Sequence, residues 1–136
     1  MKQTLVTKCF ADSNLLLYAI GPDEVMAQRS NALIMQGPII SVQVLNEFLR
    51  IATRKFKMPM SAALIALTPI KLACEIVPLT LATHERATEI AERHRIQIFD
   101  ANIVAAAQLA DCDILYTEDL NHGQSIGRVA IVNPFV

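Results

Sequence analysis

Short apolar segments alternate with longer helical patterns along almost the whole chain, and this alternation constrains the fold more than any other feature. Residues 38–41, PIIS, and 75–79, EIVPL, have the length and composition of short buried strands. Residues 42–56, between them, repeat apolar side chains at helical spacing. Strands that alternate with helices form a mainly parallel sheet with helices on both faces. The sequence therefore predicts an α/β fold.

The remaining elements follow from the same pattern. The 136 residues, of which 53% are hydrophobic, can form one well-packed domain and are too few for two. We therefore predict a single domain over residues 1–136. The expected strands are residues 4–11, 38–41, 75–79, 113–117 and 127–133. The expected helices are residues 12–20, 23–36, 42–56, 60–75, 80–95 and 100–112, with a kink or break at Pro69.

Composition excludes several classes of protein. The apolar runs are too short or too interrupted to span a bilayer, and residues 1–10 lack the apolar core of a signal peptide. We therefore expect a cytoplasmic protein with no membrane association. The three cysteines and three histidines show no CxxC, HxxxH or HxH spacing, so neither a disulfide framework nor a zinc site is indicated. A formal net charge of −1 means that nucleic-acid binding would require a local basic patch.

Four acidic residues are placed to meet at one edge of the predicted sheet. Asp12 directly follows the first strand, and Asp119 follows the fourth. The carboxyl ends of parallel strands share one edge, so these two side chains should lie close together. Asp100 opens a helix on its apolar side, and Glu47 lies about 9 Å along the helix that follows the second strand. Both can face the same crevice.

Each of these acids also has an ordinary interpretation, since Asp12, Asp100 and Asp119 could cap helices and Glu47 could be a solvated helix residue. Together, however, four carboxylates at one edge repel one another unless a cation offsets their charge. Mg²⁺ binds through a few carboxylates while it keeps several waters. Such a site can activate water and stabilise a phosphoryl oxyanion.

Five segments resemble, in order and spacing, the successive motifs of PIN-domain proteins, and above all those of VapC-type toxin nucleases. They are FADSNLLLYA at 10–19, LNEFLR at 45–50, FDANIVAAA at 99–107, YTEDLNHGQ at 116–124 and VNPF at 132–135. The resemblance extends from about residue 6 to residue 135. It implies a PIN-like three-layer α/β/α domain with a central, mainly parallel sheet of about five strands. It also implies a Mg²⁺- or Mn²⁺-dependent endoribonuclease that leaves a 5′-phosphate and a 3′-hydroxyl.

The resemblance assigns roles residue by residue. Thr117 matches a hydroxyl residue that supports the acidic cluster, and Asn14 lies where the family often places a polar side chain. Glu118 should point away from its neighbour and remain solvated. The acids that bind metal and support phosphodiester hydrolysis in the family match Asp12, Glu47, Asp100 and Asp119.

The resemblance also implies partners: an RNA substrate, a cognate antitoxin protein and a second copy of the chain in a homodimer. Arg50, Arg54 and Lys55 are candidates for RNA binding, although a solvated helix face explains them equally well. The apolar helix at 60–73 and the helix before it could supply a surface for the dimer or the antitoxin, or could simply pack in the core.

Two other functions compete with a toxin ribonuclease. A non-catalytic PIN-like module that binds RNA or regulates another protein should have lost one or more acids, whereas all four are present. A receiver-type phosphoacceptor domain shares the α/β layout but requires an acidic pair at the first strand and a late lysine. No lysine follows Lys71, which argues against the receiver interpretation.

Overall fold

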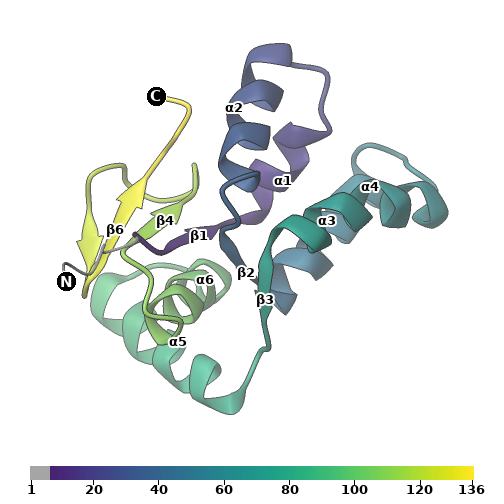
Figure 1. The fold of residues 1–136 in the computed structure, drawn as a ribbon. Coiled ribbons are helices and arrows are strands. Elements are labelled where there is room, and N and C mark those ends of the chain that lie inside the picture. Colours follow the sequence, from purple (N-terminus) through teal and green to yellow (C-terminus); the bar gives the residue numbers. More distant parts are fainter. Residues whose placement is uncertain (1–6) are drawn as a thin grey trace, which may run out of the picture.

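Strands and helices alternate in the computed structural model, which describes residues 7–136 (Figure 1). The predicted first strand begins at residue 4, and its first three residues lie outside the described part of the chain. The strands are Cys9–Ala11 (β1), Ile39–Ser41 (β2), Glu75–Val77 (β3), Ile114–Tyr116 (β4), Ser125–Ile126 (β5) and Val129–Val132 (β6). The helices are Ser13–Ala19 (α1), Glu24–Ile34 (α2), Val42–Arg54 (α3), Met60–Ala73 (α4), Leu81–His94 (α5) and Ile98–Leu109 (α6).

The strands form one sheet in the order β3-β2-β1-β4-β6-β5. All neighbouring strands run parallel except β5, which pairs antiparallel with β6. Right-handed crossovers place α1 to α4 on one face of this sheet and α5 with α6 on the other, which gives three layers (Figure 1). The predicted α/β/α arrangement is therefore confirmed, and β5 is one strand more than expected.

The core lies between the inner strands and the helices that cover them. Phe10 in β1, Leu115 in β4 and Ile131 in β6 are fully buried side by side across the centre of the sheet. Ala101 and Ala105 are also fully buried in α6, and their small side chains let this helix lie close to the strands. Each large apolar side chain buried in this way stabilises the fold by about 1.5–3 kcal/mol.

Helix α4 is unbroken although it contains Pro69, so the predicted break is wrong. The missing amide of Pro69 would have donated to the carbonyl of Ile65, and both residues lie on the exposed side of the helix. Water can satisfy that carbonyl, which explains why the helix continues. At 14 residues α4 is also too short to cross a bilayer, and none of the helices within residues 7–136 is both long and apolar enough to do so.

Candidate active site at the carboxyl edge of the sheet

The order in which the strands are added to the sheet reverses between β1 and β4, and several polar side chains lie at this point. From β1 the chain continues to β2 on one side, whereas β4 lies on the other side. The carboxyl ends of two such strands leave a crevice in which ligands bind in open α/β sheets. Ala11 pairs with Tyr116, so Asp12 and Thr117 follow side by side, and the Asp12 amide donates to the Tyr116 carbonyl at 3.0 Å.

Asp12 is the N-cap of α1 and is buried, with 3% of its surface exposed. Its Oδ1 accepts the Ser13 amide at 2.7 Å, and its Oδ2 accepts the Thr117 hydroxyl at 2.8 Å. Burial raises the pKa of Asp12 to about 7, and the charges of Asp119 and Glu47 add to this rise, while the two hydrogen bonds oppose it. Asp12 therefore caps a helix and also belongs to an acidic cluster.

Thr117 joins the end of β4 to this cluster. Its fully buried hydroxyl oxygen accepts the backbone amide of Asp119 at 3.1 Å and the Asn14 side-chain amide at 3.4 Å. Asn14 Nδ2 also lies 3.2 Å from Asp119 Oδ2. The side-chain carbonyl oxygen of Asn14 is buried and has no hydrogen-bond partner among residues 7–136. Thr117 and Asn14 thus hold Asp12 and Asp119 next to each other.

Glu47 on α3 and Asp100 in the first turn of α6 face the same crevice from two helices. Desolvation raises the pKa of Glu47, and the charges of Asp119 and Asp100 raise it further. Desolvation also raises the pKa of Asp100, which accepts Gln97 Nε2 at 3.1 Å. Gln97, and not Asp100, is the N-cap residue of α6, so the helix begins two residues earlier than predicted.

A groove of about 960 Å³ opens over these acids. Glu47, Asp100 and Asp119 line it, whereas buried Asp12 lies outside its lining. Of the three basic candidates only Arg50 lines the groove, because Arg54 and Lys55 lie exposed at the carboxyl end of α3. The other lining residues are Gln43, Asn46, Leu79, Gln97, Phe99 and Asn102.

The groove offers oxygen ligands to a cation. Within residues 7–136 no group of three or more His, Cys, Asp or Glu side chains is close enough to hold a metal ion directly. Beyond the rise caused by burial, the charge of Asp119 raises the pKa values of Asp12, Glu47 and Asp100, and a hydrogen bond from Ser13 and the charge of Arg50 only partly offset this for Glu47. Carboxylates and the unpartnered Asn14 carbonyl suit Mg²⁺ or Mn²⁺ that is held partly through waters.

Two neighbours of the acids differ from what the sequence suggested. Glu118 is exposed, but it is not simply solvated, because Tyr18 donates its hydroxyl to the carboxylate oxygens at 2.8 and 3.0 Å. Ser13 was given no role from the sequence, whereas a hydrogen bond from its side chain lowers the pKa of Glu47. Its position directly after Asp12, at the start of α1, is the one sequence signal that could have indicated this role.

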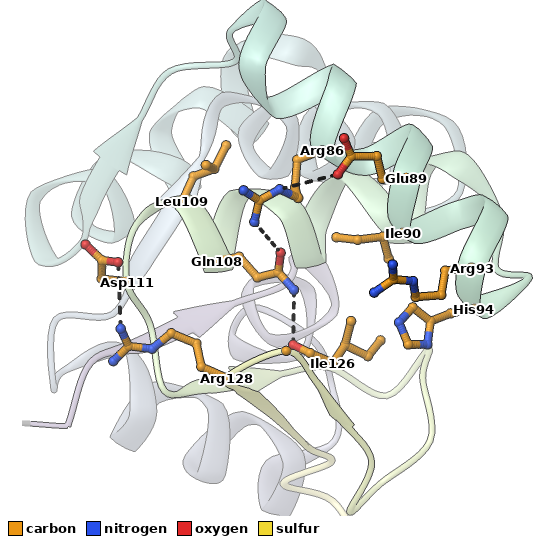
Figure 2. Close-up of a pocket in the computed structure, with 11 residues that line it drawn as sticks. Arg86, Glu89, Ile90, Arg93, His94, Gln108, Leu109, Asp111, Ile126 and Arg128 are labelled. Atoms are coloured by element: carbon orange, nitrogen blue, oxygen red, sulfur yellow. Dashed lines mark hydrogen bonds and ion pairs between the residues drawn. The ribbon is translucent and has the colours of Figure 1, made fainter.

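A second cavity, of about 610 Å³, lies between α5, α6 and the turn from β5 to β6 (Figure 2). Arg86 from α5 donates to Gln108 Oε1 at 3.0 Å, and Gln108 Nε2 donates to the Ile126 carbonyl at 3.1 Å. Arg128 pairs with Asp111 at 3.7 Å on the same side. The cavity adjoins the carboxyl end of α6, where Gln108 lies about 12 Å along that helix from Asp100 in the acidic groove. These arginines tie elements together and do not face the acids.

Fold and site together define the class of this protein. It is a doubly wound α/β domain with an acidic crevice at the switch point, between β1 and β4, where the strand order reverses. The PIN domain family profile matches residues 9–125, and the chain belongs to this family. The predicted family is therefore confirmed.

Solved structures with the same fold include VapC20 from Mycobacterium tuberculosis, a toxin that cleaves the sarcin–ricin loop. Its TM-score is 0.67 at 18% identity over 82% of this chain and 90% of that one. A toxin–antitoxin complex from Klebsiella pneumoniae has a TM-score of 0.66 at 20% identity, over 93% of this chain and 98% of that one. VapBC2 from Rickettsia felis, bound to a DNA fragment from its promoter, has a TM-score of 0.69 at 17% identity, over 92% of this chain and 97% of that one. No curated protein matches the sequence.

Proposed function

We propose that this chain is a metal-dependent endoribonuclease that hydrolyses RNA phosphodiester bonds, and that it acts in the cytoplasm as the toxin of a toxin–antitoxin pair. The observation that carries this proposal is the meeting of Asp12, Glu47, Asp100 and Asp119 at the carboxyl edge of a PIN fold. Structures with this fold include a toxin that cleaves an RNA loop and a toxin–antitoxin complex, which supports the same function.

The four acids would hold Mg²⁺ or Mn²⁺, which when bound lowers the pKa of a water and stabilises negative charge on the phosphate. Thr117 fixes Asp12 by donating to Oδ2, and this hydrogen bond favours the ionised carboxylate that a metal requires. Asn14 fixes Asp119 in the same way, by donating from Nδ2 to Oδ2. The network leaves the carboxylates little freedom to turn away from one another.

Glu47 and Arg50 complete the chemistry of the groove from one helix. The raised pKa of Glu47 brings its carboxylate closer to the pH at which it can accept a proton from an attacking water. Arg50 lines the same groove and places a positive charge where the RNA phosphate would lie. The substrate is thereby held with its phosphate toward the acids and its backbone against α3.

Partner proteins would bind where apolar side chains remain exposed. Ile65 and Leu72 on α4 are 75% and 83% exposed, and Leu64 is also exposed. We propose that this side of α4 contacts the cognate antitoxin or a second copy of the chain. Burying it would remove apolar surface from water, which is the usual driving force of such interfaces.

Cleavage of a pool of structured RNA by the purified protein tests the function. We expect cleavage with Mg²⁺ or Mn²⁺, none with a chelator, and none by a folded Asp12→Asn variant. If wild-type protein bound the metal and the RNA but cut nothing, the non-catalytic PIN-like binding module would replace the nuclease. If Asp12→Asn cleaved as fast as wild type, the assignment of the site would be wrong.

A further inference from the structure

We propose that Phe99 is the platform on which an unpaired nucleobase of the RNA substrate stacks, next to the acids that face the scissile phosphate. This inference rests on the proposed function and adds the residue that recognises a base.

Phe99 is an aromatic residue that the fold leaves uncovered. The chain has five phenylalanines and no tryptophan, and Phe10 and Phe48 are fully buried in the core. Phe99, by contrast, is 66% exposed. Within the part of the chain that the structure describes, it is the only aromatic residue that lines the acidic groove. A large apolar ring in a polar groove is available to a ligand.

The position of Phe99 relative to the acids suits a nucleotide. Phe99 directly precedes Asp100, so their Cα atoms lie about 3.8 Å apart, and both side chains line the groove. A phosphate held near Asp100 and Asp119 therefore places an adjoining base within reach of the ring. Aromatic side chains that stack bases are the usual means by which proteins recognise unpaired RNA.

The backbone of Phe99 is fixed to the helix that carries Glu47. Gln43 Nε2 donates to the Phe99 carbonyl at 3.1 Å, and Gln43 Oε1 accepts the side-chain amide of Asn102. Gln43 and Glu47 are four residues apart, so they lie on the same face of α3. Helix α3 thus positions both Glu47 and the segment that carries Phe99. This fixes the position of the ring relative to the acids.

Polar neighbours make a base a better occupant than the side chain of a protein. The exposed amides of Asn46 and Gln97 line the groove with Phe99, and each offers a donor and an acceptor to the edge of a base. Leu79 adds apolar surface to the same groove. An apolar protein side chain would cover Phe99 and Leu79 but leave the Asn46 amide unpaired, whereas Gln97 already donates to Asp100. A base in a duplex is already stacked on its neighbours, which excludes double-stranded RNA from this platform.

The test compares wild-type protein with Phe99→Leu, with Phe99→Tyr, which keeps a ring, and with Phe56→Leu. Phe56 is the matched control because it is 42% exposed, follows α3 and does not line the groove. Cleavage of a single-stranded RNA oligomer gives kcat and KM. Binding is measured by the quenching of 2-aminopurine at an unpaired position, in an Asp12→Asn background that leaves the groove lining unchanged.

We expect Phe99→Leu to raise KM about 5- to 150-fold, the range found when a stacking side chain is removed. It should leave kcat nearly unchanged and abolish the quenching of 2-aminopurine, while Phe99→Tyr and Phe56→Leu behave like wild type. Annealing the oligomer to its complement should abolish quenching. Thermal unfolding of Phe99→Leu checks that the variant is folded, which its exposure leads us to expect.

Two results separate this inference from the nuclease proposal. If wild type cleaves RNA and Phe99→Leu changes neither KM nor quenching, the platform is refuted, the nuclease stands, and the exposed ring would belong to a protein partner. If quenching depends on Phe99 but wild type cleaves nothing with any metal, the nuclease is refuted and the platform stands. A Phe56→Leu variant as defective as Phe99→Leu would also overturn the platform.

Discussion

The hydroxyl of Thr117 donates a 2.8 Å hydrogen bond to Oδ2 of Asp12, and this bond joins the ends of the two strands that flank the switch point. The same oxygen accepts the backbone amide of Asp119 at 3.1 Å. Both Thr117 and Asp12 are buried, so water cannot replace these interactions. The geometry of the first and fourth acids therefore depends on one hydroxyl group.

Replacing Thr117 with valine should weaken cleavage about 10- to 100-fold, as does the loss of other groups that orient metal ligands. Valine fits the space but leaves Asp12 Oδ2 and the Asp119 amide unpaired, which should lower the free energy of unfolding by about 1–3 kcal/mol. Steady-state kinetics and urea unfolding measure the two effects. Thr117→Ser keeps the hydroxyl and should retain most activity; a serine variant as impaired as valine would contradict the role of the bond.

Asp12 should make the metal-free protein less stable as the pH rises. Its pKa is about 7 in the folded protein and 3.8 as an ordinary aspartate, so the folded state binds the proton more tightly. The contribution of Asp12 to stability is then fully present below pH 4 and is lost as the pH rises through 7, by up to about 4 kcal/mol at about 1.4 kcal/mol for each pKa unit. The raised pKa values of Glu47 and Asp100 act in the same direction.

Urea unfolding in a chelator at pH 5 and pH 8 measures this dependence. Asp12→Asn removes the largest contribution, so the difference between the two pH values should shrink but not vanish. The comparison is between the changes in the free energy of unfolding from pH 5 to pH 8, so any effect of the asparagine that does not depend on pH cancels. An Asp12→Asn variant with the same pH dependence as wild type would show that Asp12 ionises normally.

Divalent cations should stabilise the folded protein, because they offset the repulsion among the carboxylates and bind only where the fold assembles them. We expect Mn²⁺ or Mg²⁺ to raise the Tm at pH 8, and to raise it less at pH 5, where the carboxylates hold more protons. Asp100→Asn should reduce the shift, whereas Glu92→Gln, at an exposed acid on α5 outside the groove, should not. Equal shifts in both variants would place the cation elsewhere.

Charge reversal should distinguish the roles of Arg50 and Arg54 in RNA binding. Arg50 lines the acidic groove and Arg54 does not, although the two lie one helical turn apart. Arg50→Glu should raise KM and lower the dependence of binding on salt, since one phosphate contact is lost. Arg54→Glu should have little effect. Salt titrations of RNA binding by both variants measure the difference, and equal defects would point to a diffuse basic surface.

Much of the acidic edge could be predicted because parallel strands impose it. Once Cys9–Ala11 and Ile114–Tyr116 are recognised as strands, Asp12 and Thr117 must follow at one edge. The strand Ser125–Ile126 could not be recognised, because two residues carry no periodicity and pair only through the chain reversal at 127–128. The start of α6 was misplaced because Asp100 is a favoured cap residue, while Gln97 occupies that position.

Individual side-chain contacts between distant segments could not be predicted from the sequence. The hydrogen bond from Gln43 to the carbonyl of Phe99 joins residues 56 positions apart, and neither residue carries a local signal of it. The exposure of Phe99 likewise depends on how α6 meets the groove. The pairing of Tyr18 with Glu118, 100 positions apart, is a similar case. Local patterns predict the elements, whereas tertiary packing decides which side chains remain available to ligands.

The most direct measurement compares Asp119→Asn with Glu118→Gln in metal-dependent cleavage of RNA. The two acids are adjacent in sequence, but Asp119 lines the groove and Glu118 accepts the hydroxyl of Tyr18. We predict that Asp119→Asn loses more than about 100-fold in rate, since even indirect supports of metal ligands contribute 10- to 100-fold, and that Glu118→Gln remains close to wild type. Full activity in Asp119→Asn, or equal losses in both variants, would contradict a metal site built on Asp119.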